Sequence, residues 1–380
     1  MRFVHTADWQ LGMTRYFLDT DAQARYTDAR LDAITRIGTV ASHHGAEFVL
    51  VCGDVFEDNR LAPAVVARSL DRIADLPVPV YLLPGNHDPL DAASVYTSEH
   101  FRRHVPGNVV VLDSAGVHPV RDGVEILAAP WFSKHPSADP LTEALAAAPR
   151  PARGVVRIAA GHGGTLSVGH RDQRLIDVAA VGAAIDAGRL RYVALGDRHS
   201  VTEVRPGVWY SGAPEVTNFD HIEPDSGSVL LVDTDTVDDS GMVTPEPIPV
   251  GTWAFRSREM TLGSSADVER AAAELAALPD KDRTVLKLAF TGTLDLAAKA
   301  ALDGELDSLR ARFAAVEAWP QRTDLAVLPG HDEFAALELT GPAAASADEL
   351  TGIARGHGAD AEDASAALAL LYRLAGGGAR

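Results

Sequence analysis

The sequence predicts an α/β fold, with a large layered domain followed by a smaller α+β segment. Short apolar runs alternate with amphipathic helical patterns between residues 3 and 83, in the order strand, helix, strand, helix, strand. This alternation is typical of a sheet covered by helices. A run of alternating prolines at 245–249 cannot lie in a central strand, so it indicates a linker or a sheet edge and a domain boundary.

The expected elements follow in chain order. In the first part we expect strands at 3–6, 48–52, 78–83, 108–112, 124–129, 153–160, 192–195, 208–210 and 229–232, and helices at 29–43, 63–73 and 179–185. In the second part we expect strands at 254–261, 283–291 and 325–327, a helix at 267–278 and a largely helical stretch at 294–316. The Ala-rich stretch 346–374 predicts one or two amphipathic helices, either folded back on the preceding segment or docking a partner.

Composition limits the class of protein. The 380 residues are enough for two or three domains, and no apolar run is long enough for a membrane span. The N-terminus has no signal-peptide pattern, and the single Cys52 excludes an internal disulfide, so a cytoplasmic location is expected. The net charge of −19 is unfavourable for a protein that binds nucleic acid alone, so any such affinity would come partly from a partner.

Polar side chains follow three of the predicted strands. Asp8 and Asp54 each come directly after an apolar strand, and Gly85-Asn86-His87-Asp88 follows a third, with Gly85 permitting a tight turn. Ligands usually bind at the strand ends of open α/β sheets. Carboxylate, amide and imidazole groups together suit Mn, Fe, Zn or Mg. The sequence therefore predicts a metal site at this sheet edge.

The order of these motifs resembles the calcineurin-like metallophosphoesterases. The matching segments are Asp8-Trp9-Gln10, Gly53-Asp54, Gly85-Asn86-His87-Asp88, Gly161-His162-Gly163 and Gly196-Asp197-Arg198-His199. The opening His5-Thr6-Ala7-Asp8, the length and the C-terminal extension are most similar to the Mre11/SbcD nuclease branch. The resemblance implies a two-sheet αββα sandwich at 1–250, an α+β capping domain at 251–340 and a helical C-terminal tail at 341–380.

The resemblance also implies two divalent metal ions, with Mn²⁺ as first choice and Mg²⁺ or Fe²⁺ as alternatives. Metal 1 would take Asp8, Gln10, Asp54 and His199, and metal 2 would take Asp54, Asn86, His162 and Asp197. His87 would be catalytic, as the phosphate-contacting histidine. Asp88 would assist it by fixing the His87 tautomer through a hydrogen bond.

Two positions depart from the family pattern. Gln10 and Asp197 stand where imidazoles are usual, so the site loses two imidazoles and gains one negative charge. We expect a preference for harder metals and weaker binding of metal 1. The alternative is a degraded site in a scaffold protein.

The expected function is a metal-dependent DNA nuclease subunit acting in DNA end processing and repair. The resemblance implies DNA and an SMC-like ATPase of the Rad50/SbcC type as partners. It also implies a homodimer through residues 60–75 and 90–104, and no membrane. The alternatives are a phosphoesterase for a small phosphorylated substrate and a non-catalytic architectural subunit of the ATPase complex.

Overall fold

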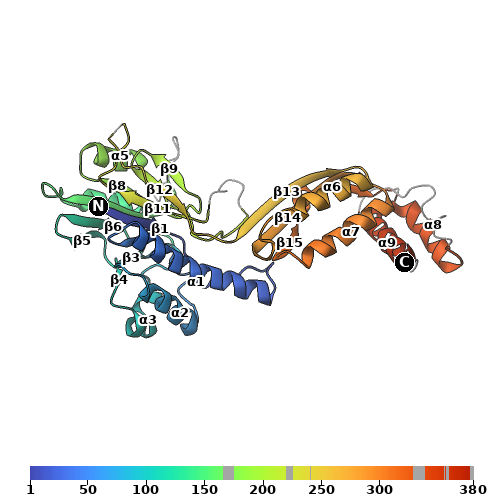
Figure 1. Ribbon diagram of the computed structural model, residues 1–380, viewed down its shortest axis with the longest axis horizontal. Helices are drawn as coiled ribbons and strands as arrows, with labels where there is room; N and C mark the ends of the chain where they lie inside the picture. The colour runs from blue at the N-terminus through green and yellow to red at the C-terminus, as the bar shows by residue number, and fades with distance from the viewer. Residues whose placement is uncertain are drawn as a thin grey trace. The chain divides into compact units, whose positions relative to one another are not determined.

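The computed structural model describes residues 1–165, 175–219, 226–239, 241–327, 339–354, 356 and 359–376. The chain forms two compact units (Figure 1). Unit 1 comprises Met1–Tyr16 and Gln23–Trp253, and unit 2 comprises Phe17–Ala22 and Ala254–Arg380. Each unit has its own core. None of the described helices is both long and apolar enough to cross a membrane.

The first sheet of unit 1 is built from strands that are mostly parallel. In spatial order it contains β12 (Glu246–Pro249), β11 (Ser228–Asp233), β1 (Arg2–Thr6), β2 (Val49–Cys52), β3 (Val80–Leu83) and β4 (Val109–Val111). β1 to β4 are parallel, whereas β11 pairs with β1 antiparallel and β12 with β11 antiparallel. The carboxyl ends of β1 to β4 therefore lie at the same edge of the sheet. The proline run lies in β12, at the side of the sheet where prolines are tolerated.

The second sheet of unit 1 is also mixed. Its order is β5 (Gly116–Arg121), β6 (Val124–Ala128), β7 (Val156–His162), β8 (Tyr192–Gly196), β10 (Val208–Tyr210) and β9 (Thr202–Arg205). The central strands β6, β7, β8 and β10 are parallel, and the outer strands β5 and β9 pair antiparallel.

Helices cover the outer face of each sheet. α1 (Thr20–His43) and α2 (Pro63–Ala74) bury Ile34, Ile37 and Leu70 against the first sheet, with α3 (Glu99–His104) beside them. α4 (Pro140–Ala147) and α5 (Val178–Asp186) bury Leu141 and Val181 against the second sheet. Between the sheets lies a third core, whose larger members are Phe3, Phe48, Leu50, Ile126, Ile158 and Tyr192. Unit 1 is thus an αββα sandwich, and the predicted fold class is confirmed.

Unit 2 is an α+β unit around a smaller parallel sheet. Its strands are β13 (Ala254–Leu262), β14 (Thr284–Leu294), β15 (Ala315–Ala318) and β16 (Asp324–Val327), with β14 in the centre. Its helices are α6 (Ser265–Ala276), α7 (Leu296–Arg310), α8 (Pro342–Ala354) and α9 (Ala359–Gly376). α9 packs on α7, where Leu368 meets Leu296. Residues 328–338 and 377–380, which the expected domain ranges include, lie outside the described residues.

Some sequence-based assignments differ from the structure, and the helices α3 and α4 had no sequence-based assignment. The stretch 294–316 is not helical throughout, because α7 ends at Arg310 and the last two residues lie in β15. The edge strands β5 and β9 were missed, since both carry polar residues at intermediate burial and lack a buried apolar run. α1 begins at Thr20 rather than near residue 29. Just before this start, Asp19 Oδ1 accepts a hydrogen bond from Ala22 N at 2.7 Å.

Candidate metal centre

Two aspartates leave the carboxyl ends of β1 and β2 in an unusual backbone conformation. The φ angles of Asp8 and Asp54 are 54° and 52°, and those of Gln10 and Asp197 are 43° and 101°. Of the described non-glycine residues with positive φ, all but Asp280 are predicted metal ligands. Residues held in this region cost free energy and tend to cluster at functional sites. The strain is therefore concentrated where the sequence places the chemistry.

The two sheets approach each other closely at these strand ends, and this requires glycine. A Cβ on Gly196, the last residue of β8, would lie 1.9 Å from the carbonyl oxygen of Cys52 in β2. A Cβ on Gly85 would lie 2.2 Å from Asp54 Oδ1. Neither glycine has positive φ. Gly196 thus permits the close approach of the two sheets. Gly85 permits close packing against Asp54 at the end of the neighbouring strand of its own sheet, rather than the tight turn that the sequence suggested.

The approach brings carboxylate and imidazole groups from both sheets together. Single ligand atoms of Asp8, Asp54 and His162 all lie within 4.8 Å of one another, and all three residues are buried. Asp197 joins them from β8, since its Oδ1 lies 3.8 Å from His162 Nε2. The backbone N–H of Asp197 donates to Asp8 Oδ2 at 3.1 Å.

Asn86 closes the side of the cluster next to β3. Its amide oxygen lies 2.7 Å from His162 Nε2. With the amide turned over, its nitrogen would instead donate to both oxygens of Asp54 at 3.2 Å. Either orientation places the Asn86 amide against Asp54 and His162, as the predicted metal 2 set requires.

Two buried oxygens of predicted metal 1 ligands have no hydrogen-bond donor among the described residues. They are Asp8 Oδ1 and Gln10 Oε1, whose residues are 0% and 3% exposed. Gln10 is held in place by its backbone N–H, which donates to the Asp54 carbonyl at 2.8 Å. Buried acceptors are normally satisfied, and a carboxylate left unpaired is costly. A bound cation is one way to satisfy buried oxygens of this kind.

Ionisation of the cluster reflects its crowding. Burial raises the pKa of Asp8 well above its ordinary value, and the charges of Asp54 and Asp197 raise it further. Burial lowers the pKa of His162, but the carboxylates of Asp54, Asp8 and Asp197 outweigh burial and hold that pKa well above 6.5. Burial likewise raises the pKa of Asp54, and the imidazoles of His162 and His87 outweigh it and hold that pKa below its ordinary value. The cluster therefore holds protons that a metal would displace.

The histidines are oriented through their Nδ1 atoms. Nδ1 of His162 lies 2.8 Å from the carbonyl of Cys52, which can only accept, so Nε2 faces the cluster. His199 Nδ1 lies 2.7 Å from the hydroxyl of Thr217, and its Nε2 lies 3.9 Å from Asp8 Oδ1. Burial lowers the pKa of His199. Each imidazole thus presents Nε2 to the carboxylates of the opposite sheet.

His87 lies at the opening of the cluster. Its side chain is 39% exposed, and Nε2 lies 4.0 Å from Asp54 Oδ2. Its backbone N–H donates to Asp54 Oδ1 at 2.9 Å, and Nδ1 donates to the carbonyl of Glu57 at 2.8 Å. The ring can therefore reach a group bound at the cluster while its tautomer is fixed from behind.

The expectation for Asp88 is wrong. Its carboxylate does not contact His87, because the Glu57 carbonyl occupies Nδ1. Asp88 instead accepts from Gly85 N at 2.7 Å, Phe56 N at 3.0 Å and Tyr96 Oη at 2.6 Å. Burial, and then the charge of Asp54, raise its pKa to about 6. Asp88 shapes the loop that carries Asn86 and His87.

Several supporting residues had no signal in the sequence. Trp131 donates from Nε1 to the His162 carbonyl at 2.7 Å, and Thr217 contacts His199. Both act through contacts that are remote in the chain. Tyr210 donates to the Gly163 carbonyl at 2.7 Å.

The residues present fit divalent cations. The oxygen and imidazole ligand atoms come from Asp8, Gln10, Asp54, Asn86, His162, Asp197 and His199. Two of these oxygens are buried and accept no hydrogen bond in the described part of the chain. This donor set suits Mn²⁺, Mg²⁺ or Fe²⁺ better than the thiolate-binding metals.

Comparisons with known proteins agree with this arrangement. The family model of the calcineurin-like phosphoesterases matches residues 1–201, which include every residue of the cluster. The SbcD subunit of the nuclease SbcCD from Rhodobacter capsulatus is 30% identical to this chain, over 83% of this chain and 86% of that protein. The chain belongs to the calcineurin-like phosphoesterases. Within them it belongs to the Mre11/SbcD branch, as the His5-Thr6-Ala7-Asp8 opening, the length and the C-terminal extension predicted.

Two further relatives match less extensively. The SbcD subunit of the nuclease SbcCD from Bacillus subtilis is 30% identical over 26% of each chain. The crystal structure of TT1561 from Thermus thermophilus aligns with 66% of this chain and 98% of that one, at 12% identity and a TM-score of 0.39. The latter similarity is too low to add to the assignment.

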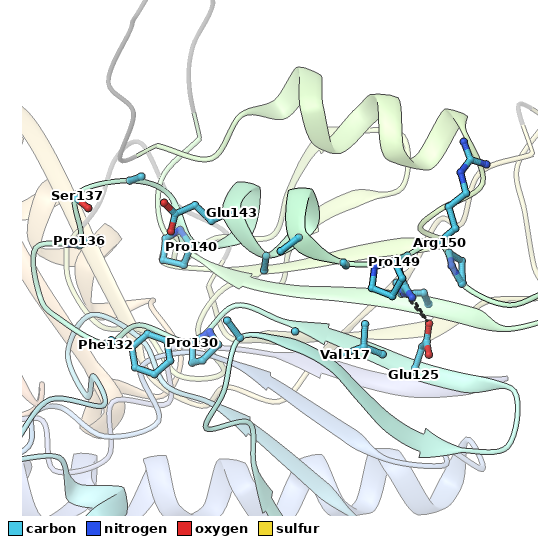
Figure 2. A pocket seen from close by; sticks show the side chains of 18 of the residues that line it. Val117, Glu125, Pro130, Phe132, Pro136, Ser137, Pro140, Glu143, Pro149 and Arg150 are labelled. Carbon is cyan, nitrogen blue, oxygen red and sulfur yellow. Dashed lines mark hydrogen bonds and ion pairs between the residues drawn. The ribbon is translucent and has the colours of Figure 1, made fainter.

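A groove of about 910 Å³ lies on the outer side of this phosphoesterase unit, away from the cluster. Figure 2 shows Pro130 and Phe132 towards one end and Glu125, Pro149 and Arg150 towards the other. The buried Arg157 bonds Glu125 at 2.7 Å, so the polar groups at its base are already paired. None of the predicted site residues lines it.

Proposed function

We propose that this phosphoesterase is a DNA nuclease subunit that hydrolyses phosphodiesters with two divalent metal ions. The observation that carries the proposal is the cluster of Asp8, Asp54 and His162, with ligand atoms within 4.8 Å of one another, beneath a solvent-accessible His87. Such bound ions activate water and neutralise phosphate charge. Metal 1 would be held by Asp8, Gln10, Asp54 and His199, and metal 2 by Asp54, Asn86, His162 and Asp197.

The chain's own residues supply the remaining steps. Asp54 has both carboxylate oxygens directed into the cluster, against His162 and His87, so it suits a bridging position. His87 Nε2 lies 4.0 Å from Asp54 Oδ2 on a side chain that is 39% exposed, and its hypothesised role is to contact the phosphate and protonate the leaving oxygen. Asp88 contributes by holding the loop of His87 rather than by contacting substrate.

The partners proposed are DNA and an SMC-like ATPase of the Rad50/SbcC type. The Rhodobacter capsulatus relative is named as one subunit of the SbcCD nuclease, and it matches most of this chain. The net charge of −19 favours a partner that contributes DNA affinity. In this proposal unit 2 takes the place of the capping domain and tail, the chain forms a homodimer, and the complex acts in DNA repair in the cytoplasm.

The test is degradation of end-labelled duplex and single-stranded DNA with Mn²⁺, with and without the ATPase. Wild type is compared with His87→Ala and with His135→Ala, a control that changes an exposed histidine outside the cluster. We expect cleavage by wild type and the control and a loss of about 10²-fold or more in His87→Ala.

Cleavage by none of the proteins, with or without the ATPase, would overturn the nuclease proposal. A small phosphodiester substrate then separates the alternatives. Its hydrolysis would indicate a small-substrate phosphoesterase, and its persistence would indicate an architectural subunit.

A further inference from the structure

Arg30 on α1 is a buried cation with no ion pair in the described part of the chain. It is 3% exposed, and no carboxylate of the described residues lies within 4.0 Å of its guanidinium. Its Nη2 is buried and has no hydrogen-bond partner among those residues. An uncompensated buried charge costs folding free energy. The burial of the Arg30 guanidinium therefore indicates a role for the contacts that it makes.

The hydrogen bonds of Arg30 run to two different segments. Nε donates to the carbonyl of Trp9 at 3.2 Å. Nη1 donates to the carbonyl of Val216 at 3.3 Å and to Tyr26 Oη at 3.0 Å. Tyr26 Oη in turn donates to the same Val216 carbonyl at 2.5 Å. The planar guanidinium thus fastens the segment around Trp9 to the segment around Val216.

One of these segments carries residues of the metal 1 set, and the other contacts a third member of the set. Trp9 lies between Asp8 and Gln10, whose side chains are the two with buried, undonated oxygens. Val216 immediately precedes Thr217, whose hydroxyl meets His199 Nδ1 at 2.7 Å. The metal 2 residue His162 is oriented separately by the Cys52 carbonyl.

We propose that Arg30 is the positioning residue of the metal 1 half of the centre, an inference that rests on the two-metal function proposed above. It holds the Asp8–Gln10 loop at a fixed distance from the segment that orients His199. Removing it loosens metal 1 and leaves metal 2 in place. The fixed positive charge does not itself bind substrate, because Arg30 is buried.

The experiment measures Mn²⁺ binding to the full chain by isothermal titration calorimetry and electron paramagnetic resonance, without substrate. Arg30→Met removes the guanidinium, and Arg30→Lys keeps the charge with a donor that cannot span both carbonyls. Arg36→Met is the matched control. Arg36 lies on the same helix and bonds the Val250 carbonyl and, at 2.9 Å, Oε1 of Glu215, the residue before Val216. Its hydrogen bonds to the described residues do not include the Trp9 carbonyl, so this control keeps the Arg30 link between the two segments.

We expect two Mn²⁺ ions per chain in wild type and in Arg36→Met. Arg30→Met should weaken one of the two sites by about 10- to 100-fold and leave the other unchanged. Arg30→Lys should recover part of the loss. If Arg30→Met does not fold, Thr217→Val replaces it, since this change removes the contact to His199 without changing the charge. Thr217→Ser, which keeps the hydroxyl, should rescue the weakened site.

Four results would overturn the inference. For Arg30→Met, they are unchanged Mn²⁺ affinity at both sites, equal weakening of both sites, and tighter binding of the second Mn²⁺ ion. Where Thr217→Val is used, the fourth is equal Mn²⁺ binding by that variant and Thr217→Ser. Tighter binding would mean that Arg30 acts as a repelling charge. Absence of two Mn²⁺ ions in wild type would overturn the two-metal function together with this inference, so the two failures are distinguishable.

Discussion

Replacing His162 with glutamine tests whether metal binding displaces a proton from the centre. In the metal-free protein, Nδ1 of His162 is committed to the Cys52 carbonyl, so the titrating proton sits on Nε2. That atom lies 3.3 Å from Asp54 Oδ1 and 3.8 Å from Asp197 Oδ1. At an effective dielectric constant near 20, the nearer contact attracts the imidazolium by about 5 kcal/mol, which opposes the cost of burying it.

The sign of the pH dependence follows from the raised pKa of His162. The stabilisation of the metal-free protein by the imidazolium is fully present below pH ~6.5 and is lost as pH rises through the raised pKa. A metal must displace this proton, so metal affinity increases as pH rises. It should rise about tenfold per pH unit, or about 1.4 kcal/mol, while His162 is the titrating group.

The assay is calorimetric titration of Mn²⁺ at pH 7 in buffers of different ionisation enthalpy, which counts the protons released. Asp8 can release a proton too, since burial raises its pKa, so the difference between variants matters. Wild type should release about one proton more than His162→Gln, and His135→Gln should match wild type. Equal proton release in wild type and His162→Gln, or an affinity of wild type that is flat from pH 6 to 8, would refute the reasoning.

Two further predictions concern the fold beneath the centre. Gly196→Ala places a methyl 1.9 Å from the Cys52 carbonyl, so urea unfolding should show a free energy of unfolding lower by about 3 kcal/mol or more. Gly304→Ala in α7, where a Cβ meets nothing within 4 Å, should leave that free energy unchanged or slightly higher. Similar losses in both variants would contradict the close-approach explanation. Burial lowers the pKa of His5 to about 3, with the Leu195 carbonyl opposing the shift. Unfolded chains bind that proton below pH 6.5 and the folded protein does not, so stability should fall by about 1.4 kcal/mol per pH unit between pH 6.5 and 4.5. His5→Gln should flatten this slope by about one proton, and an unchanged slope would show that His5 does not cause it.

The strand ends of unit 1 were predictable because each ligand follows an apolar run in the chain. Asp8, Asp54 and Asn86 are local features of βα corners, and the motif order brought His162 and Asp197 to the same place. The supporting contacts were not predictable. The pairing of Glu57 with His87 uses a backbone carbonyl, which any residue type supplies.

Packing between distant segments was equally invisible in the sequence. Arg30 looks like a polar residue at the start of an amphipathic helix, yet it is 3% exposed because its guanidinium packs against the carbonyls of Trp9 and Val216. Asp88 was assigned to His87 by its position in the motif. The structure gives its hydrogen bonds to Gly85, Phe56 and Tyr96, since a buried carboxylate takes the backbone donors nearest to it.

The left-handed backbone at Asp8, Asp54 and Asp197 narrows the routes by which this protein can change through evolution. Asparagine is the side chain of similar size that tolerates this conformation best after glycine. A single nucleotide change converts either aspartate codon to an asparagine codon. Natural variants that lose a metal while keeping a folded unit 1 should therefore be dominated by Asp→Asn at these three positions. In a lineage that retained only a scaffolding role, Asp→Asn at one of these positions should be the first substitution to appear.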